Sequence, residues 1–165
     1  MTKFYTKLHL LALLFIIYCL PVSVFGQTTV QIGNGTNFSA TTLYSPIYRY
    51  SATSTTTGQK SNILFTPTEM ATAGISSGDM ITSIAFNKET ADNFIVPAQY
   101  IVRMGNTTNT LLTGNTNTAT VWSSILANHT AVFTNNSFNI PATAGWVTIT
   151  LNTPFLYTGG SFEIS

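Results

Sequence analysis

The chain has 165 residues, of which 44% are hydrophobic and only 7% charged, well below the usual quarter. Its length fits one domain, and its aromatic content of 12% predicts a folded chain rather than a disordered one. A formal net charge of +1 offers no basic surface to a phosphate backbone, so we expect no nucleic-acid partner.

The first 26 residues have the pattern of a secretory signal peptide. Lys3 and Lys7 give a basic start, residues 8–20 are almost unbroken apolar sequence, and small residues at −3 and −1 precede Gln27. A membrane anchor is the alternative, but the 13 apolar residues span roughly 20 Å of helix, short of the roughly 30 Å hydrocarbon core. We therefore expect a secreted protein, extracellular or at the cell surface, without a membrane span after cleavage.

Cleavage would leave residues 27–165 as one module. These residues hold four basic and five acidic side chains, and no cysteine, because Lys3, Lys7 and Cys19 leave with the signal. Disulfides, thiolate metal sites and thiol redox chemistry are thereby excluded from the module. An exported domain without disulfides must rely on its hydrophobic core.

The module reads as short strands joined by turns. Threonine supplies 28 of its 139 residues, and threonine with aromatic and branched residues suits a half-buried pleated surface. Apolar residues recur with a period of two at residues 30–32, 48–50, 63–65, 80–86, 100–104 and 147–151. Gly- and Asn-rich turns are expected at residues 33–35, 57–58, 87–93, 105–106, 114–115, 135–136 and 159–160.

Eight or nine strands without helical crossovers predict an all-β fold. We expect an antiparallel β-sandwich of jelly-roll or fibronectin-like type with one short helical turn. That turn is expected at residues 66–71, where Thr66 is a candidate N-cap, Pro67 takes the first helical position and Glu69 completes a capping box. Residues 106–120, the most polar stretch, are expected to form a long surface loop with strands on both sides.

Two of the alternating segments predict which side chains face the core. Met80, Ile84 and Phe86 are expected to share the inner face of one strand. In the segment at residues 147–151, Val147, Ile149 and Leu151 should point inward, and the two threonines between them should point outward. The chain then stops inside the alternating segment 161–165, so we expect it to be a fragment, incomplete at its C-terminus and with an open sheet edge there.

A G-x-S-x-G motif around Ser76 invites comparison with α/β-hydrolases. Asp79 or Asp92 and then His129 follow it in the order that such enzymes use. The nucleophile of those enzymes needs a strand before it and a helix after it, whereas here a helical turn precedes Ser76 and a strand follows. We expect no catalytic role for Ser76 and no enzymatic activity.

Other candidate sites are weaker still. Asn87, Glu89, Asp92 and Asn93 cluster in one loop and are a candidate calcium site, but two carboxylates without a D-x-D-x-D-G pattern fit a solvated hairpin tip equally well. We therefore expect no structural metal and no cofactor. His129 is the one histidine after the signal, and a lone surface histidine is the expectation for it.

Aromatic side chains are numerous enough to form a stacking platform for a carbohydrate. At alternating strand positions such side chains more often bury large areas in the core, and we expect most of them to be core or core-edge residues. The residues in question are Tyr44, Tyr48, Tyr50, Tyr100, Trp122, Trp146 and Tyr157.

Three strings, at residues 59–70, 80–87 and 145–157, resemble a β-module of secreted multidomain proteins of Bacteroidetes. The last one carries Trp146, an alternating run and then Thr153-Pro154-Phe155 before a further strand. The resemblance implies a non-catalytic, adhesin-like β-sandwich in cargo of type IX secretion. It implies no catalytic or ligand residues.

These observations favour a secreted binding or adhesion module with an extracellular carbohydrate or protein as its partner. The alternative is an N-terminal accessory domain of a secreted protease or glycosidase whose catalytic domain lies downstream of residue 165. Nine charged residues scattered singly over the module argue against a self-contained enzyme.

Overall fold

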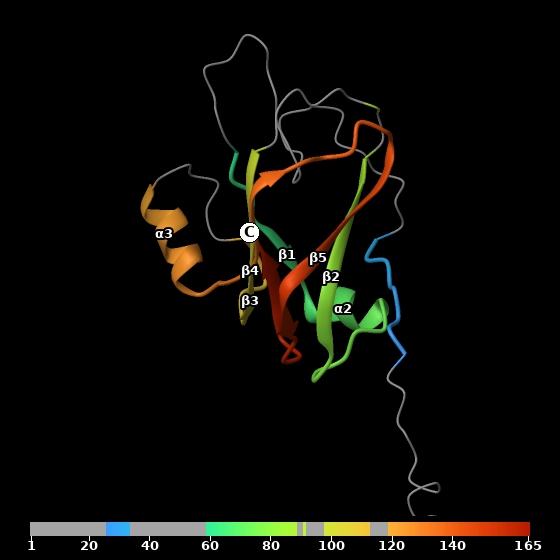
Figure 1. The fold of residues 1–165 in the computed structure, drawn as a ribbon. Coiled ribbons are helices and arrows are strands. Elements are labelled where there is room, and N and C mark those ends of the chain that lie inside the picture. The colour runs from blue at the N-terminus through green and yellow to red at the C-terminus, as the bar shows by residue number, and fades with distance from the viewer. Residues whose placement is uncertain (1–25, 34–58, 89–90, 92–97, 113–118) are drawn as a thin grey trace, which may run out of the picture.

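The computed structural model describes residues 26–33, 59–88, 91, 98–112 and 119–165. The described strands form two sheets (Figure 1), one with four strands in the order β1-β6-β3-β4 and one that pairs β2 with β5. Their pairings are all antiparallel, which confirms the predicted all-β, sandwich-like fold class. The elements are β1 (Ile63–Phe65), α2 (Pro67–Thr72), β2 (Met80–Lys88), β3 (Ala98–Thr107), α3 (Ala119–Ala127), β4 (Thr130–Phe138), β5 (Gly145–Leu156) and β6 (Ser161–Ile164).

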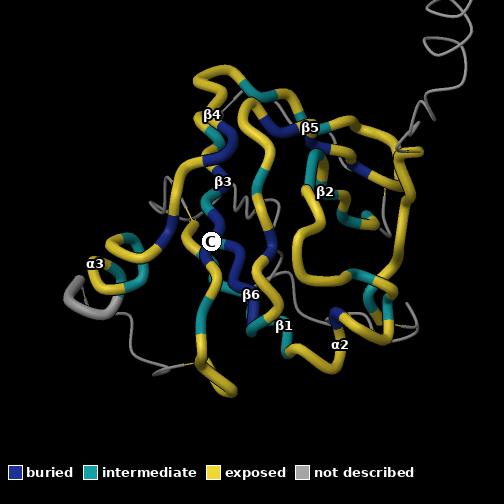
Figure 2. Tube along the Cα trace, turned by 90° about the horizontal axis from the view of Figure 1, so that it is seen from below, coloured by how far each residue is buried: buried dark blue, intermediate teal, exposed yellow. Residues whose placement is uncertain are grey.

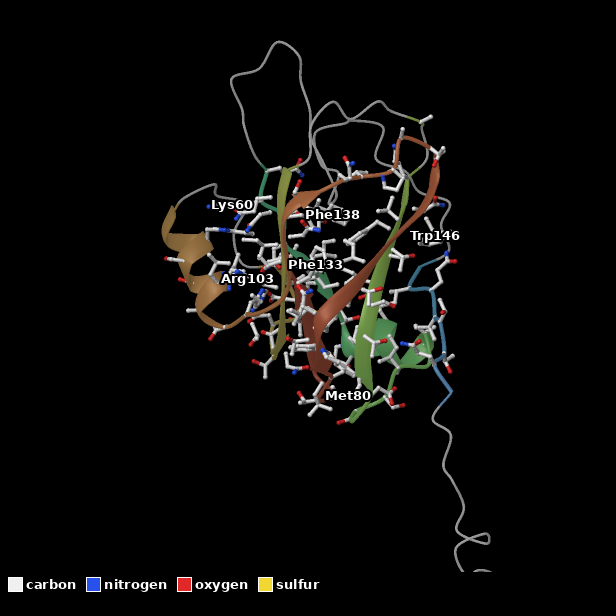
Figure 3. The ribbon with its side chains drawn as sticks, in the orientation of Figure 1. Lys60, Met80, Arg103, Phe133, Phe138 and Trp146 are labelled. Carbon is white, nitrogen blue, oxygen red and sulfur yellow. The ribbon has the colours of Figure 1, made fainter. Side chains whose placement is uncertain are left out.

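The hydrophobic core lies between the inner faces of the two sheets (Figure 2). Met70 of α2 contributes to it and is fully buried. Phe133 and Phe138 lie between the sheets in Figure 3, with their ring centroids 5.6 Å apart in an edge-to-face arrangement. The buried core residues are Met70, Val102, Met104, Val132, Phe133, Ile149, Leu151, Tyr157, Phe162 and Ile164.

Strand β5 has the facing that its sequence predicts. Val147, Ile149 and Leu151 are buried, whereas Thr148 and Thr150 are exposed. Trp146, in contrast, leaves 58% of its surface exposed, so it is an exception to the expectation that most of the named aromatic residues belong to the core or its edge. Side chains alternate between the two faces of a strand, so Trp146, which directly precedes the inward-facing Val147, points outward.

Strand β2 departs from the predicted facing where its pairing with β5 is irregular. From the pair Ile81–Phe155 to the pair Ser83–Thr150, β2 advances by two residues and β5 by five, so the extra residues lie in β5. Ile81 before this irregularity and Ile84 and Phe86 after it all pack against the core. Met80 is consequently 53% exposed, and its predicted inward position is wrong.

Two of the expected turns are also wrong, because their residues lie inside strands. Residues 105–106 belong to β3 and residues 135–136 to β4. The pair Gly159-Gly160 does separate β5 from β6, as predicted. Residues 30–32 form no strand, although Ile32 packs against the core. The strand expected at residues 48–50 and the turns at 57–58 and 114–115 lie outside the described residues.

The predicted helical turn is α2, and its capping box is present. The backbone N–H of Glu69 donates to Thr66 Oγ1 at 3.3 Å, and the backbone N–H of Thr66 donates to Glu69 Oε2 at 2.7 Å. These bonds hold the pKa of the exposed Glu69 carboxyl below its usual value, because they favour the charged form. Gly74 follows the helix with a φ of +86° that favours glycine.

A second helix, α3, stands where a loop followed by a strand was expected, so the fold has more helix than the one turn predicted. Its partly buried side chains Trp122, Ile125 and Leu126 are spaced i, i+3, i+4, which is the period of one helix face. The helix lies on the outer side of the four-stranded sheet, away from β2 (Figure 1). Neither described helix is long and apolar enough to cross a membrane.

Strand β6 is an interior strand of the four-stranded sheet. It pairs with β1 on one side and with β3 on the other, so the expectation of an open edge at this strand is wrong. All four of its residues are buried. Phe162 and Ile164 face the core, whereas Ser161 and Glu163 face the outer side, where α3 and the neighbouring loops cover them.

Candidate functional site

A buried carboxylate, Glu163, lies at the centre of the outer face of the four-stranded sheet. Only 5% of the residue is exposed. Its Oε2 accepts hydrogen bonds from Asn62 Nδ2 at 2.9 Å and faces His129 Nε2 at 3.2 Å, while its Oε1 accepts from Asn109 Nδ2 at 3.1 Å. Burial of a carboxylate is costly unless hydrogen bonds replace its hydration. These three donors replace it, and they lie just before β1, just after β3 and just before β4.

His129 lies between the end of α3 and the start of β4, and its side chain is almost fully buried. Its Nε2 faces Glu163, and its Nδ1 lies 2.8 Å from Ser165 Oγ. The neutral tautomer that suits both contacts carries its proton on Nε2 and accepts the hydroxyl proton of Ser165 at Nδ1. Burial lowers the pKa of His129, and nearby Arg103 lowers it further, although Glu163 opposes both effects.

Gly105 of β3 makes room for this imidazole. It pairs with Glu163 across the sheet, and a Cβ at this position would overlap His129 Cδ2 and lie 2.9 Å from the carbonyl oxygen of Asn128. A glycine inside a strand often marks the close approach of another group. The residue that reads as a turn signal in the sequence is therefore the position over which the histidine packs.

Ser165, His129 and Glu163 form a hydroxyl–imidazole–carboxylate array, the order of groups found in serine hydrolases. In those enzymes backbone N–H groups beside the serine stabilise the oxyanion. Here the N–H of Ser165 donates to Arg103 O at 2.9 Å, and its carbonyl accepts from Arg103 N at 2.7 Å. The serine is thus bound within the sheet, and the array is suited to fixing the start of β4 onto the outer face.

A hollow of about 760 Å³ opens above this array, between α3 and the turn that joins β5 to β6. This volume is within the range of small-molecule sites. Seven of its 11 lining residues carry a hydroxyl or amide side chain, and we call it the amide hollow. It is lined by Asn106, Thr107, Thr108, Asn109, Ser124, Ile125, Asn128, His129, Thr158, Gly160 and Glu163.

Hydrogen bonds hold several wall residues of the amide hollow in place. Asn106 Nδ2 donates to Leu156 O at 3.0 Å, and its Oδ1 accepts from the N–H of Thr158 at 3.1 Å. Asn128 Nδ2 donates to Ser124 O at 3.2 Å. The shape of this wall is therefore set before a ligand binds, which lowers the entropic cost of binding.

The sites predicted from the sequence lie elsewhere. Ser76 is exposed between α2 and β2, in the order helix, serine, strand that its sequence predicts, and its N–H donates to Asp79 Oδ2 at 2.8 Å. Asn87 is exposed and belongs to β2, where it pairs with Trp146. The other members of the calcium candidate, Glu89, Asp92 and Asn93, lie outside the described residues, as do Tyr44, Tyr48 and Tyr50.

The sequence reading missed His129 and Glu163 as a pair, and the expectation of a lone surface histidine is wrong. One signal was present: Glu163 stands between Phe162 and Ile164 in an alternating segment, and a charged side chain in a buried strand needs a partner. His129 lies 34 residues away in the sequence. Within the described part of the chain, no three histidine, cysteine, aspartate or glutamate side chains gather to hold a metal ion.

Comparisons of the chain with protein-family models, curated proteins and solved structures found no match. The resemblance to secreted β-modules of Bacteroidetes therefore stays a prediction.

Proposed function

We propose that this chain is an exported, non-catalytic binding module and that the amide hollow holds its ligand. The observation that carries the proposal is a concave wall of hydroxyl and amide groups in which the buried charge is satisfied internally by Asn62, Asn109 and His129. Export is supported by the signal-peptide pattern of residues 1–26.

The chemistry of the wall favours the neutral hydroxyl groups of a ligand, and a glycan is the extracellular molecule that carries many of them. Asn106, Asn109 and Asn128 offer both donors and acceptors, and Thr108 and Thr158 offer hydroxyls that can do either. The side chain of Ile125 adds one apolar contact for a sugar face. A ligand with alternating hydroxyl donors and acceptors can satisfy such a wall without bringing a charge of its own.

The experiment blocks the hollow from an exposed position. Thr158 lines the hollow and its side chain is exposed, so Thr158→Trp should fill the space without touching the core. Thr148→Trp is the matched control, because Thr148 is an exposed position of β5 outside the lining. Binding is measured by affinity electrophoresis of the full chain in gels containing neutral polysaccharides, namely dextran, xylan and β-glucan.

We expect at least one neutral polysaccharide to retard the wild type and the Thr148→Trp variant, and the Thr158→Trp variant to lose that retardation. Equal retardation of the two variants would place the binding surface elsewhere. If circular dichroism shows that all three proteins are folded and no polysaccharide retards any of them, the proposal is overturned.

A further inference from the structure

A second hollow, of about 320 Å³, lies on the other side of the contact between His129 and Ser165. His129 lines the amide hollow, Ser165 lines this second one, and their side chains meet at 2.8 Å. The second hollow carries Lys60, Arg103 and the ring of Trp122 on its wall. We call it the cationic hollow.

The cationic hollow concentrates positive charge in a chain that has little of it. Residues 27–165 contain four basic side chains, and two of them, Lys60 and Arg103, line this one hollow. No Asp or Glu side chain is among its lining residues in the described part of the chain. Such a concentration raises the local potential for an anion, and the surrounding low-dielectric walls strengthen it.

The three acidic side chains that the structure describes are engaged elsewhere. Glu69 caps α2, Asp79 accepts from the N–H of Ser76, and Glu163 is bound by His129 and two asparagines. Within the described residues, the one ion pair is that between His129 and Glu163. Neither Lys60 nor Arg103 therefore forms an ion pair with a described Asp or Glu side chain.

The fold holds both cations on the outer face of the four-stranded sheet. Arg103 is half-buried, and its backbone bonds to Ser165 fix it at the centre of that sheet. Lys60 precedes β1, and its Nζ lies 5.7 Å from the ring centroid of Trp122 on α3, a cation–π contact. Figure 3 shows both side chains on the α3 side of the molecule, whereas Trp146 lies on the opposite side.

We propose that the cationic hollow binds the carboxylate or sulfate group of an acidic glycan, whose neutral hydroxyls occupy the adjoining amide hollow. This inference rests on the proposed function and names the class of its ligand. The guanidinium of Arg103 matches the two oxygens of a carboxylate or sulfate, and Lys60 adds a point charge. An acidic glycan has the two chemistries, neutral hydroxyl and anion, that the adjacent hollows offer.

The test compares charged and neutral forms of one polymer on the full chain. Dextran sulfate and polygalacturonate are the acidic probes, and unmodified dextran is the neutral probe. Lys60→Gln and Arg103→Gln remove the two charges singly. Lys88→Gln is the matched control, since it removes the same charge from β2, where Lys88 Nζ donates to the carbonyls of Pro141 and Ala142 instead.

We expect an acidic probe to bind more tightly than dextran, and each of Lys60→Gln and Arg103→Gln to weaken that binding about tenfold, the value of one charged hydrogen bond. Lys88→Gln should change it by less than about twofold, as for a charge outside the contact. Preference for dextran sulfate over polygalacturonate, or the reverse, tells which anion fits. Because Arg103 is half-buried, Lys60→Gln at an exposed position keeps the test valid if Arg103→Gln fails to fold.

Three results would overturn the inference, and they separate it from the proposed function. If Lys60→Gln weakens acidic binding no more than Lys88→Gln, the attraction is general and the cationic hollow is not a site. If dextran binds as tightly as dextran sulfate and Thr158→Trp abolishes both, the amide hollow binds a glycan without an anionic subsite. If no probe binds, both proposals fail.

Discussion

The two faces of the four-stranded sheet differ in the interactions that stabilise their buried residues. The inner face packs Val102, Met104 and Phe162 against the second sheet, and any side chain of suitable size and shape serves that purpose. The outer face buries Glu163 and His129, which need particular atoms at particular distances. Apolar burial is non-directional, whereas a buried hydrogen-bonded charge depends on every partner. The outer face should therefore be the less tolerant of substitution.

The largest effect is expected from Glu163→Ala. The substitution leaves Asn62 Nδ2, Asn109 Nδ2 and His129 Nε2 without their acceptor in a buried site. We expect the free energy of unfolding to fall by about 3 to 5 kcal/mol, the usual result of removing one member of a buried polar pair. Urea denaturation measures this free energy. The control is Glu69→Ala, which removes an exposed carboxylate and should lower the free energy of unfolding far less. Similar losses for the two variants would contradict the importance of the outer cluster.

The inner face is tested by Ile149→Ala, which should cost about 2 to 4 kcal/mol because it leaves a cavity in the core. Ile149 is 1% exposed. Its neighbour Thr150 points to the outside, and Thr150→Ser should cost under about 0.5 kcal/mol. A near-neutral Ile149→Ala variant in the same denaturation experiment would show that the space between the sheets collapses around the smaller side chain.

The packing of the outer face is tested by Gly105→Ala. Its added Cβ would overlap His129 Cδ2, so we expect a loss of about 1 to 3 kcal/mol, the range for overpacking a closed site. The same substitution in a His129→Ala background should cost less than half as much, because the ring is no longer there. Equal costs in both backgrounds would mean that the Asn128 carbonyl, and not the imidazole, sets the need for glycine.

The smallest effect is a dependence of stability on pH. The pKa of His129 is lowered in the fold, so above the unfolded value of 6.5 the side chain is neutral in both states and its contribution is fully present. As the pH falls below 6.5, the unfolded chain takes up the proton before the folded one does, and stability declines until the folded pKa is passed. Melting temperatures from pH 7.5 to 4.5 should show this decline in the wild type and less of it in His129→Gln. If the melting temperatures of the wild type and His129→Gln declined in parallel, the pH dependence would belong to other titratable groups.

Elements that depend on short-range pattern were predictable from the sequence. The capping box of Thr66 and Glu69 and the facing of β5 follow from residues three or two positions apart, and both are confirmed. The helix α3 was predictable in principle from the spacing of Trp122, Ile125 and Leu126, but the polar residues 106–120 suggested a loop followed by a strand. The irregular pairing of β2 with β5 was not predictable, because a shift of register is visible only against the partner strand.

Sequence alone determined the period of each strand, the absence of cysteine after residue 26 and the scarcity of charge. Only the tertiary structure decided that β6 is an interior strand, that Gly105 lies beneath His129, and that Glu163, Asn62 and Asn109 meet. The physical reason is range. Alternation and capping act between neighbours in the chain, whereas a buried carboxylate is stabilised by donors that lie 101, 54 and 34 residues away and come together only when the strands pair.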